Sequence, residues 1–165
     1  MIVILILSLL SPALFAQRIN NQQEQSELKA KILEAAKNET TSIQNQGQKL
    51  ILLKDLRKKS SGFGVVDAAQ ADEKESMLIA VDPETKKIYY SDGSIKLKLK
   101  SGQDISEIAS EYFLDANIYI KTLNLHFVKS KNPRKDLSLL IEQLNNDPRI
   151  EVAELEAQRT IRRVR

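Results

Sequence analysis

The sequence contains no cysteine and no tryptophan, and aromatic residues make up only 5% of its 165 residues. The absence of cysteine excludes disulfides, thiolate chemistry and cysteine-ligated zinc. The scarcity of aromatics means that a core must consist mostly of Leu, Ile, Val and Ala. The single histidine, His126, lies on a predicted strand without an adjacent carboxylate or second histidine, a pattern typical of a surface or packing residue. We therefore expect neither a metal nor a cofactor.

An excess of charge of one sign is also nearly absent, since the formal net charge is only +3. Residues 17–93 carry 12 basic and 12 acidic side chains, whereas residues 94–165 carry 13 basic and 10 acidic ones. Four arginines account for this excess: Arg159, Arg162, Arg163 and Arg165. The charge pattern indicates a local basic end rather than a polyanion-binding surface, and we expect no nucleic-acid partner.

The first 16 residues are apolar and uncharged, and they are fewer than the roughly 20 that span a bilayer. Ala16 followed by Gln17-Arg18 fits signal-peptide cleavage, although no Lys or Arg precedes the apolar run and Leu14 occupies position −3. An uncleaved anchor and a buried N-terminal strand are the alternatives. The sequence predicts a secreted or periplasmic protein, with no stable membrane insertion once the signal is removed.

Residues 17–59 are polar, with apolar side chains at helical spacing in two thin stripes: Leu28, Ile32, Ala35 and Ala36, then Leu50, Leu53 and Leu56. They predict a helical, partly disordered arm. The run Ser60-Ser61-Gly62-Phe63-Gly64 indicates a linker, placed over residues 60–76. Apolar residues 77–81 and 88–90 flank Asp82-Pro83 and predict a β-hairpin.

The stretch from Ser94 to Glu156 reads strand, helix, strand, strand, helix, strand. Lysines alternate with apolar residues over 95–100, Asp104 opens a helix, and Asn132-Pro133 is a good start for a second helix. This order predicts an α+β fold: a ferredoxin-like βαββαβ antiparallel sheet with two helices on one face, preceded by a helical arm and a β-hairpin. The ferredoxin-like domain with its hairpin is placed at residues 77–156, and a basic C-terminal tail at 157–165. The second face of the sheet, with the lysines, stays open within this domain.

The closing run from Asn146 to Glu154, Asn-Asp-Pro-Arg-Ile-Glu-Val-Ala-Glu, follows a predicted helix. This run, the strand and Ser101-Gly102 turn before the capped helix, and the paired strands ending at Lys129 resemble the propeptides of subtilisin-family (S8) proteases. The resemblance covers about residues 94–156. It departs from the family pattern at Leu155, where the family often has proline after the final glutamate.

The resemblance implies that the open sheet face packs against surface helices of a subtilisin-like serine protease. It also implies that an acidic residue after the last strand meets helix N-termini of the enzyme, which favour a carboxylate. The matching positions are Glu154 and Glu156, which otherwise read as alternating surface positions on an edge strand. The residues beyond would lie in the substrate cleft as a product-like strand, so Ala157, Gln158, Arg159 and Thr160 complete the predicted protease-binding site.

No spacing of serine, histidine and carboxylate in the sequence assembles a catalytic triad, and we predict that the chain is not an enzyme. The resemblance favours an inhibitor or folding helper of a subtilisin-type protease. The alternative is an envelope protein–protein interaction module that uses the helical arm and the open sheet face. A sheet that binds RNA shares the topology but needs exposed aromatics on its central strands, and residues 95–100 have none. The sequence leaves the oligomeric state open.

Overall fold

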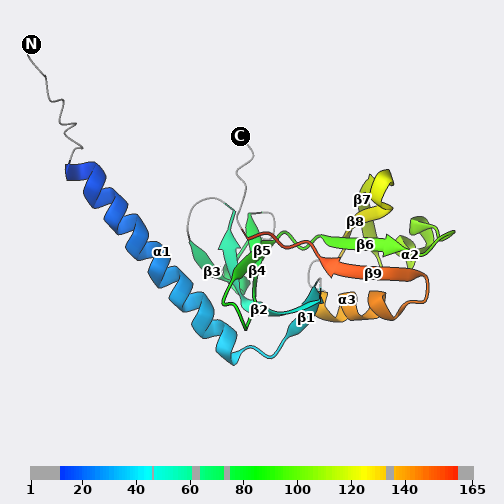
Figure 1. Ribbon diagram of the computed structural model, residues 1–165, viewed down its shortest axis with the longest axis horizontal. Coiled ribbons are helices and arrows are strands. Elements are labelled where there is room, and N and C mark those ends of the chain that lie inside the picture. The colour runs from blue at the N-terminus through cyan, green and yellow to red at the C-terminus, as the bar shows by residue number, and fades with distance from the viewer. Residues whose placement is uncertain (1–11, 46, 61–63, 73–74, 133–135, 160–165) are drawn as a thin grey trace, which may run out of the picture.

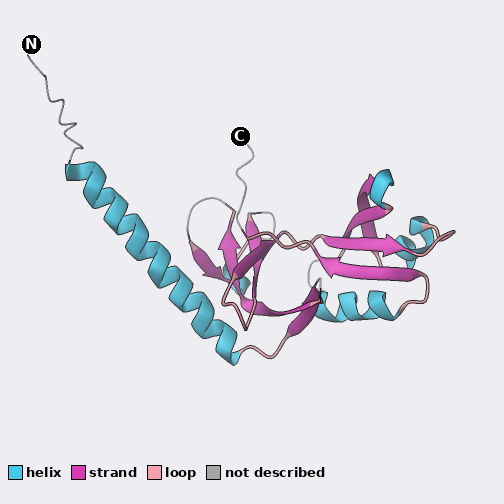
Figure 2. Ribbon diagram, viewed as in Figure 1, coloured by secondary structure: helices cyan, strands magenta, loops and turns pink. Residues whose placement is uncertain are grey.

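The structure is a computed structural model that describes residues 12–45, 47–60, 64–72, 75–132 and 136–159. Within these residues the chain forms three α-helices and two antiparallel sheets, so the predicted α+β class is confirmed (Figure 1). We call the sheet built from residues 42–91 the N-terminal sheet and the sheet built from residues 95–155 the C-terminal sheet. Figure 2 shows the long first helix standing apart from both sheets for most of its length.

The C-terminal sheet has the predicted βαββαβ order. Its elements are β6 (Ile95–Leu99), α2 (Ile105–Glu111), β7 (Leu114–Ile120), β8 (Leu125–Ser130), α3 (Leu137–Asn146) and β9 (Ile150–Leu155). The strands lie in the order β7-β8-β6-β9 and all pair antiparallel. This is the ferredoxin-like arrangement, with the first and third strands of the motif in the centre.

Both helices of this unit pack on the same face of the sheet. The buried side chains of β6 alternate with its lysines, and they form one apolar cluster with residues from α2 and α3: Ile95, Leu97, Leu99, Ile108, Leu140, Ile141 and Leu144. Asp104 caps α2 by accepting a hydrogen bond from the Ser106 amide, as predicted. Asp136, not Asn132, caps α3, because its carboxylate accepts from the amides of Ser138 and Leu139. The predicted start of the second helix at Asn132 was therefore too early.

The N-terminal sheet is built from residues that the sequence assigned to an arm, a linker and a hairpin. Its strands are β1 (Ser42–Asn45), β2 (Gln48–Lys59), β3 (Val65–Asp67), β4 (Ser76–Val81) and β5 (Ile88–Ser91). Four of them lie in the order β1-β2-β4-β5, and β3 pairs with the end of β2. A short 3₁₀ helix, η1 (Ala68–Gln70), follows β3. The predicted hairpin is confirmed as β4 and β5, although it belongs to this larger sheet.

The predicted helical arm over residues 17–59 is wrong after residue 38. Helix α1 (Pro12–Asn38) ends there, and residues 48–59 form the longest strand. The strand is buried on both faces, since Leu50 and Leu52 join the cluster of the C-terminal sheet while Leu53 and Leu56 pack under α1. A bulge between Leu53 and Arg57 also interrupts the alternation. A strand buried on both faces and bulged loses period 2, which is why its leucines mimic a helical stripe.

The predicted linker over residues 60–76 is also partly wrong, because β3 and η1 lie inside it. Of the predicted signal peptide, residues 1–11 lie outside the described part of the chain, and the backbone of 12–16 begins α1. Signal cleavage therefore stays a prediction. None of the helices described is both long and apolar enough to cross a membrane.

Among the side chains of α1 that the structure describes, those that pack on the N-terminal sheet lie from Leu28 onward. Ile32 and Ala36 are buried against Leu53, Leu56 and Ile79, whereas residues 20–27 are exposed throughout. In Figure 1 the blue N-terminal part of α1 leads away from both sheets. The helix is thus anchored through its C-terminal part and presents exposed polar side chains over residues 20–27.

The two sheets share one apolar core. Ile43, Leu50, Leu52 and Ala80 of the N-terminal sheet belong to the same buried cluster as the inward side chains of the C-terminal sheet. The segment after β9 strengthens the join, because the amides and carbonyls of Tyr90 and Gln158 exchange hydrogen bonds of 2.8 and 2.9 Å. The ferredoxin-like unit is therefore joined to the N-terminal sheet both through the shared core and through the segment that follows β9.

Candidate functional site

The face of the C-terminal sheet opposite its two helices is the candidate binding surface, which we call the open face. Strand register places its side chains in two rows that cross all four strands. One row is Ile118, Phe127, Lys96 and Glu154, and the other is Ile120, Leu125, Lys98 and Val152. Residues that face each other across antiparallel strands point to the same side, so each row forms a continuous strip. Over β7 and β8 the strips are apolar, and over β6 and β9 they are mostly charged.

Exposure confirms that the open face is accessible at its edges. Ile118 is 59% exposed and Val152 is 37% exposed, both high values for large apolar side chains. Ile120, Leu125 and Phe127 are half-buried. An exposed apolar patch bordered by charged side chains is the usual composition of a protein-binding surface.

The predicted carboxylates lie at the charged end of this face. Glu154 faces Lys96 across the β6–β9 pair. Glu156 forms an ion pair with the same lysine, its Oε2 lying 2.6 Å from Lys96 Nζ with the two side chains 22% and 23% exposed. The Glu156 amide also donates to the Ser94 carbonyl. Glu156 is therefore fixed within the fold by an ion pair and a backbone hydrogen bond, and both carboxylates are half-buried.

The structure separates the predicted tail residues from one another. Ala157 packs against the shared core, and Gln158 is bonded to Tyr90 of β5 through both of its backbone groups. Arg159 is exposed, and Thr160 lies outside the described residues. The segment 157–158 is thus bound to the N-terminal sheet, so the predicted cleft-binding strand starts no earlier than Arg159.

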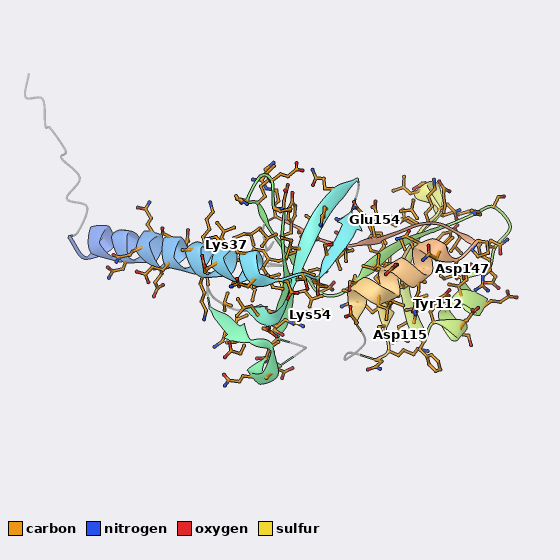
Figure 3. All side chains as sticks on the ribbon, turned by 90° about the horizontal axis from the view of Figure 1, so that it is seen from below. Lys37, Lys54, Tyr112, Asp115, Asp147 and Glu154 are labelled. Carbon is orange, nitrogen blue, oxygen red and sulfur yellow. The ribbon has the colours of Figure 1, made fainter. Side chains whose placement is uncertain are left out.

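Part of the run that carries the family resemblance has a structural role. Arg149 lies 2.6 Å from Asp147 Oδ2 and also pairs with Glu111 of α2, while the Tyr112 hydroxyl donates to the same Asp147 carboxylate at 3.1 Å. Figure 3 shows Tyr112 and Asp147 close together beside the end of α3. The Asp147 side chain is 4% exposed, and hydrogen bonds from Arg149 lower its pKa to about 2. Sequence reasoning missed Glu111 and Tyr112, because nothing local marks them as partners of residues 35 or more positions away.

His126 is a packing residue, in agreement with its sequence context. It is 9% exposed, and its ring stacks on Tyr119 with 4.4 Å between ring centroids and 17° between the planes. Burial lowers the pKa of His126, and the nearby Asp104 carboxylate opposes that effect. In the part of the chain that the structure describes, no cluster of three or more His, Cys, Asp or Glu side chains is arranged to hold a metal.

A groove of about 610 Å³ lies beside the outer edge of β9, between β1 and α3. Its lining comes from Ser42, Ile43, Gln44, Gly47, Ser138, Ile141, Glu142, Asn145, Asn146, Val152, Ala153 and Glu154. The Asn145 amide occupies the strand edge itself, donating to the Ala153 carbonyl and accepting from the Ala153 amide, both at 2.8 Å. This side chain makes the two bonds that an added strand would make at Ala153, so it blocks strand pairing at that residue.

Comparison with protein-family models, with curated proteins and with solved structures gave no match to this chain. The candidate site therefore rests on the geometry of the described residues and on the resemblance of residues 94–156 to subtilisin-family propeptides.

Proposed function

We propose that the protein is a non-catalytic, propeptide-like inhibitor or folding helper of a subtilisin-type serine protease, acting in the secreted or periplasmic space. The observation that carries this proposal is the open face, which lies opposite both helices of a ferredoxin-like sheet and ends at Glu154. The same end of the sheet gives rise to the basic tail.

The composition of the open face suits a helical partner surface. Its apolar strip over β7 and β8 offers Ile118, Phe127 and Leu125, which lose water on contact. Its charged end offers a glutamate to the N-terminus of a partner helix, where the helix dipole stabilises an anion by about 0.3–1 kcal/mol. Apolar contact at one end and charge at the other would fix the orientation of the partner.

The tail has less freedom than the resemblance implies. Since Gln158 is paired with Tyr90, residues that enter the partner's cleft without disturbing the fold start at Arg159. This divides the predicted tail contacts into Ala157 and Gln158, which must first leave β5, and Arg159 with Thr160, which follow the attachment point.

Inhibition of a panel of subtilisin-type proteases tests this function. We expect residues 17–165 to inhibit at least one of them, a form ending at Gln158 to inhibit at least tenfold more weakly, and a form ending at Glu156 to be no stronger than that. Glu154→Lys should weaken inhibition at least tenfold, about 1.4 kcal/mol. Its control, Glu142→Lys, makes the same charge change at an exposed position of α3. Inhibition by this variant should stay within twofold of wild type. Equal inhibition by Glu154→Lys and Glu142→Lys would remove the open face from the mechanism.

One observation favours the second candidate function, an envelope interaction module. Residues 20–27 of α1 are exposed along the whole segment, beyond the part of the helix that packs on the N-terminal sheet. In that case deletion of residues 17–27 would abolish partner binding, and deletion of residues 159–165 would leave it unchanged.

A further inference from the structure

The groove beside β9 has a wall that the proposed function does not use, the outer edge of β1. In Figure 1, β1 lies beside α3 at the junction of the two sheets. Strand β1 is an end strand of the N-terminal sheet, and among the described residues no element pairs with its outer side. An unpaired edge strand is a template for another strand, and proteins usually cover or charge it.

The register of β1 identifies the backbone groups that it directs into the groove. The Leu52 amide donates to the Thr41 carbonyl at 2.9 Å, so these two residues form a hydrogen-bonded pair. Hydrogen-bonded and non-hydrogen-bonded pairs alternate along antiparallel strands. Ser42 and Gln44 therefore occupy non-hydrogen-bonded positions and turn their amides and carbonyls away from β2. Both residues are exposed and line the groove.

The rest of the lining combines apolar side chains with negative charge. Ile43, Ile141 and Ala153 are buried apolar residues of the groove. Its two charged residues are both carboxylates, Glu142 and Glu154, and no lysine, arginine or histidine of the described chain lines it. Glu142 is exposed on α3. The groove's volume of about 610 Å³ falls within the range of about 300–1,000 Å³ typical of ligand pockets.

We propose that this groove binds an extended, basic peptide segment of another protein, whose backbone pairs with Ser42 and Gln44 of β1. Strand addition takes its affinity from backbone hydrogen bonds and its specificity from contacts to alternate side chains. The pairing edge is β1 rather than β9, because Asn145 already occupies the backbone groups of Ala153. The carboxylate of Glu142 favours a basic peptide over an acidic one by charge complementarity.

A peptide titration followed by NMR tests this site. The probe is the peptide Thr-Val-Arg-Val-Arg-Thr with blocked ends, added to the isotope-labelled full chain. At about 1 mM peptide we expect the amides of Ser42 and Gln44 to shift and to exchange with water at least fivefold more slowly. The acidic counterpart, Thr-Val-Glu-Val-Glu-Thr, should bind at least fivefold more weakly. No change in β1 at that concentration, or equal binding of the two peptides, would overturn the proposal.

N-methylation of the basic peptide separates strand pairing from charge attraction. Methyl groups on alternate amides block one edge of an extended peptide and leave its other edge intact. Of two peptides methylated at the two alternate sets of positions, one should lose binding at least tenfold and the other should stay within twofold of the parent. Equal effects of the two methylation patterns would contradict pairing with β1.

Charge reversal separates the groove from the protease-binding face. Glu142→Lys should weaken binding of the basic peptide at least fivefold, although its inhibition of a protease stays within twofold of wild type. The control Glu84→Lys makes the same charge change in the exposed turn between β4 and β5 and should bind the peptide as wild type does. Equal loss in the two variants would overturn the site. So would slow exchange of the Ser42 and Gln44 amides without peptide that increases with chain concentration, because a second copy would then cover β1.

Discussion

Lys54 and Asp136 form an ion pair across the junction of the two sheets, although they are 82 residues apart in the chain. Lys54 Nζ of β2 lies 2.8 Å from Asp136 Oδ2, and the two side chains are 49% and 38% exposed. Asp136 is also the N-cap of α3, so one carboxylate both begins a helix of the C-terminal unit and holds it to the N-terminal sheet. The contact marks the point at which the two units act as one fold.

Substitutions separate these two roles of Asp136. Asp136→Asn keeps a capping oxygen but removes the charge, so we expect it to lower the free energy of unfolding by less than 1 kcal/mol, the range of exposed pairs. Asp136→Ala removes the cap as well and should cost about 1 kcal/mol more. Urea denaturation measures both values. Lys54→Met should add little to Asp136→Asn because both remove the same interaction, and full additivity would contradict the pairing.

Arg149 is expected to be more important to stability than to binding. Arg149→Met leaves the Asp147 carboxylate buried without its cation, and loss of one partner of a buried pair costs about 3–5 kcal/mol. Because Arg149 itself is partly exposed, at 27% of its side chain, we expect the lower end of that range. Thermal and urea unfolding report the loss. The control Arg159→Met, on an exposed residue, should change stability by about 0.5 kcal/mol or less.

Stability should fall in acid because of the same carboxylate. The pKa of Asp147 is lowered from its ordinary value of 3.8 to about 2, first of all by hydrogen bonds from Arg149. A carboxyl with a lowered folded pKa is protonated first in the unfolded chain, so its contribution is complete above about pH 4 and disappears as the pH falls toward about 2. Asp136, lowered to about 2 chiefly by Lys54, contributes with the same sign. Free energies of unfolding from pH 6 to pH 2 should therefore fall less steeply for Arg149→Met than for wild type.

The attachment of the tail to β5 should control its digestion. Gln158→Pro removes the amide that donates to Tyr90, so the segment around Arg159 gains freedom. We expect trypsin to cleave after Arg159 several-fold faster in this variant, because proteolysis requires a segment that can unfold locally. Mass spectrometry of timed digests gives the rate. Gln158→Ala keeps the amide and should be cleaved as wild type is; equal rates in all three proteins would show that the pairing with Tyr90 does not restrain the tail.

The ferredoxin-like unit was predictable because its strands and helices each have one buried face. The alternation of Lys96 and Lys98 with apolar neighbours marks a strand, and Asp104 marks a helix start. The position of Glu154 on the open face follows from the same alternation once β9 is paired with β6.

The N-terminal sheet could not be predicted, because β2 packs apolar side chains on both of its faces. Its sequence therefore does not alternate between apolar and polar residues. Its bulge is held by Arg57, whose guanidinium donates to the carbonyls of Leu53, Lys54 and Leu56. Neither this contact nor the pairing of Gln158 with Tyr90 has a local sequence signal. The restraint on the tail, which changes the candidate site most, depends on residues 68 positions apart and follows only from the folded arrangement.

The measurement that tests the central claim most directly is a calorimetric titration of the full chain into subtilisin-type proteases whose catalytic serine is replaced by alanine. At least one of these proteases should bind the chain with one site per chain. Val152→Lys on the open face should weaken that binding at least tenfold. Leu139→Lys on α3, at an apolar side chain 50% exposed on the helix side, should bind as wild type does. Absence of binding to every protease of this type, or equal loss in the two variants, would contradict a propeptide-like role for the open face.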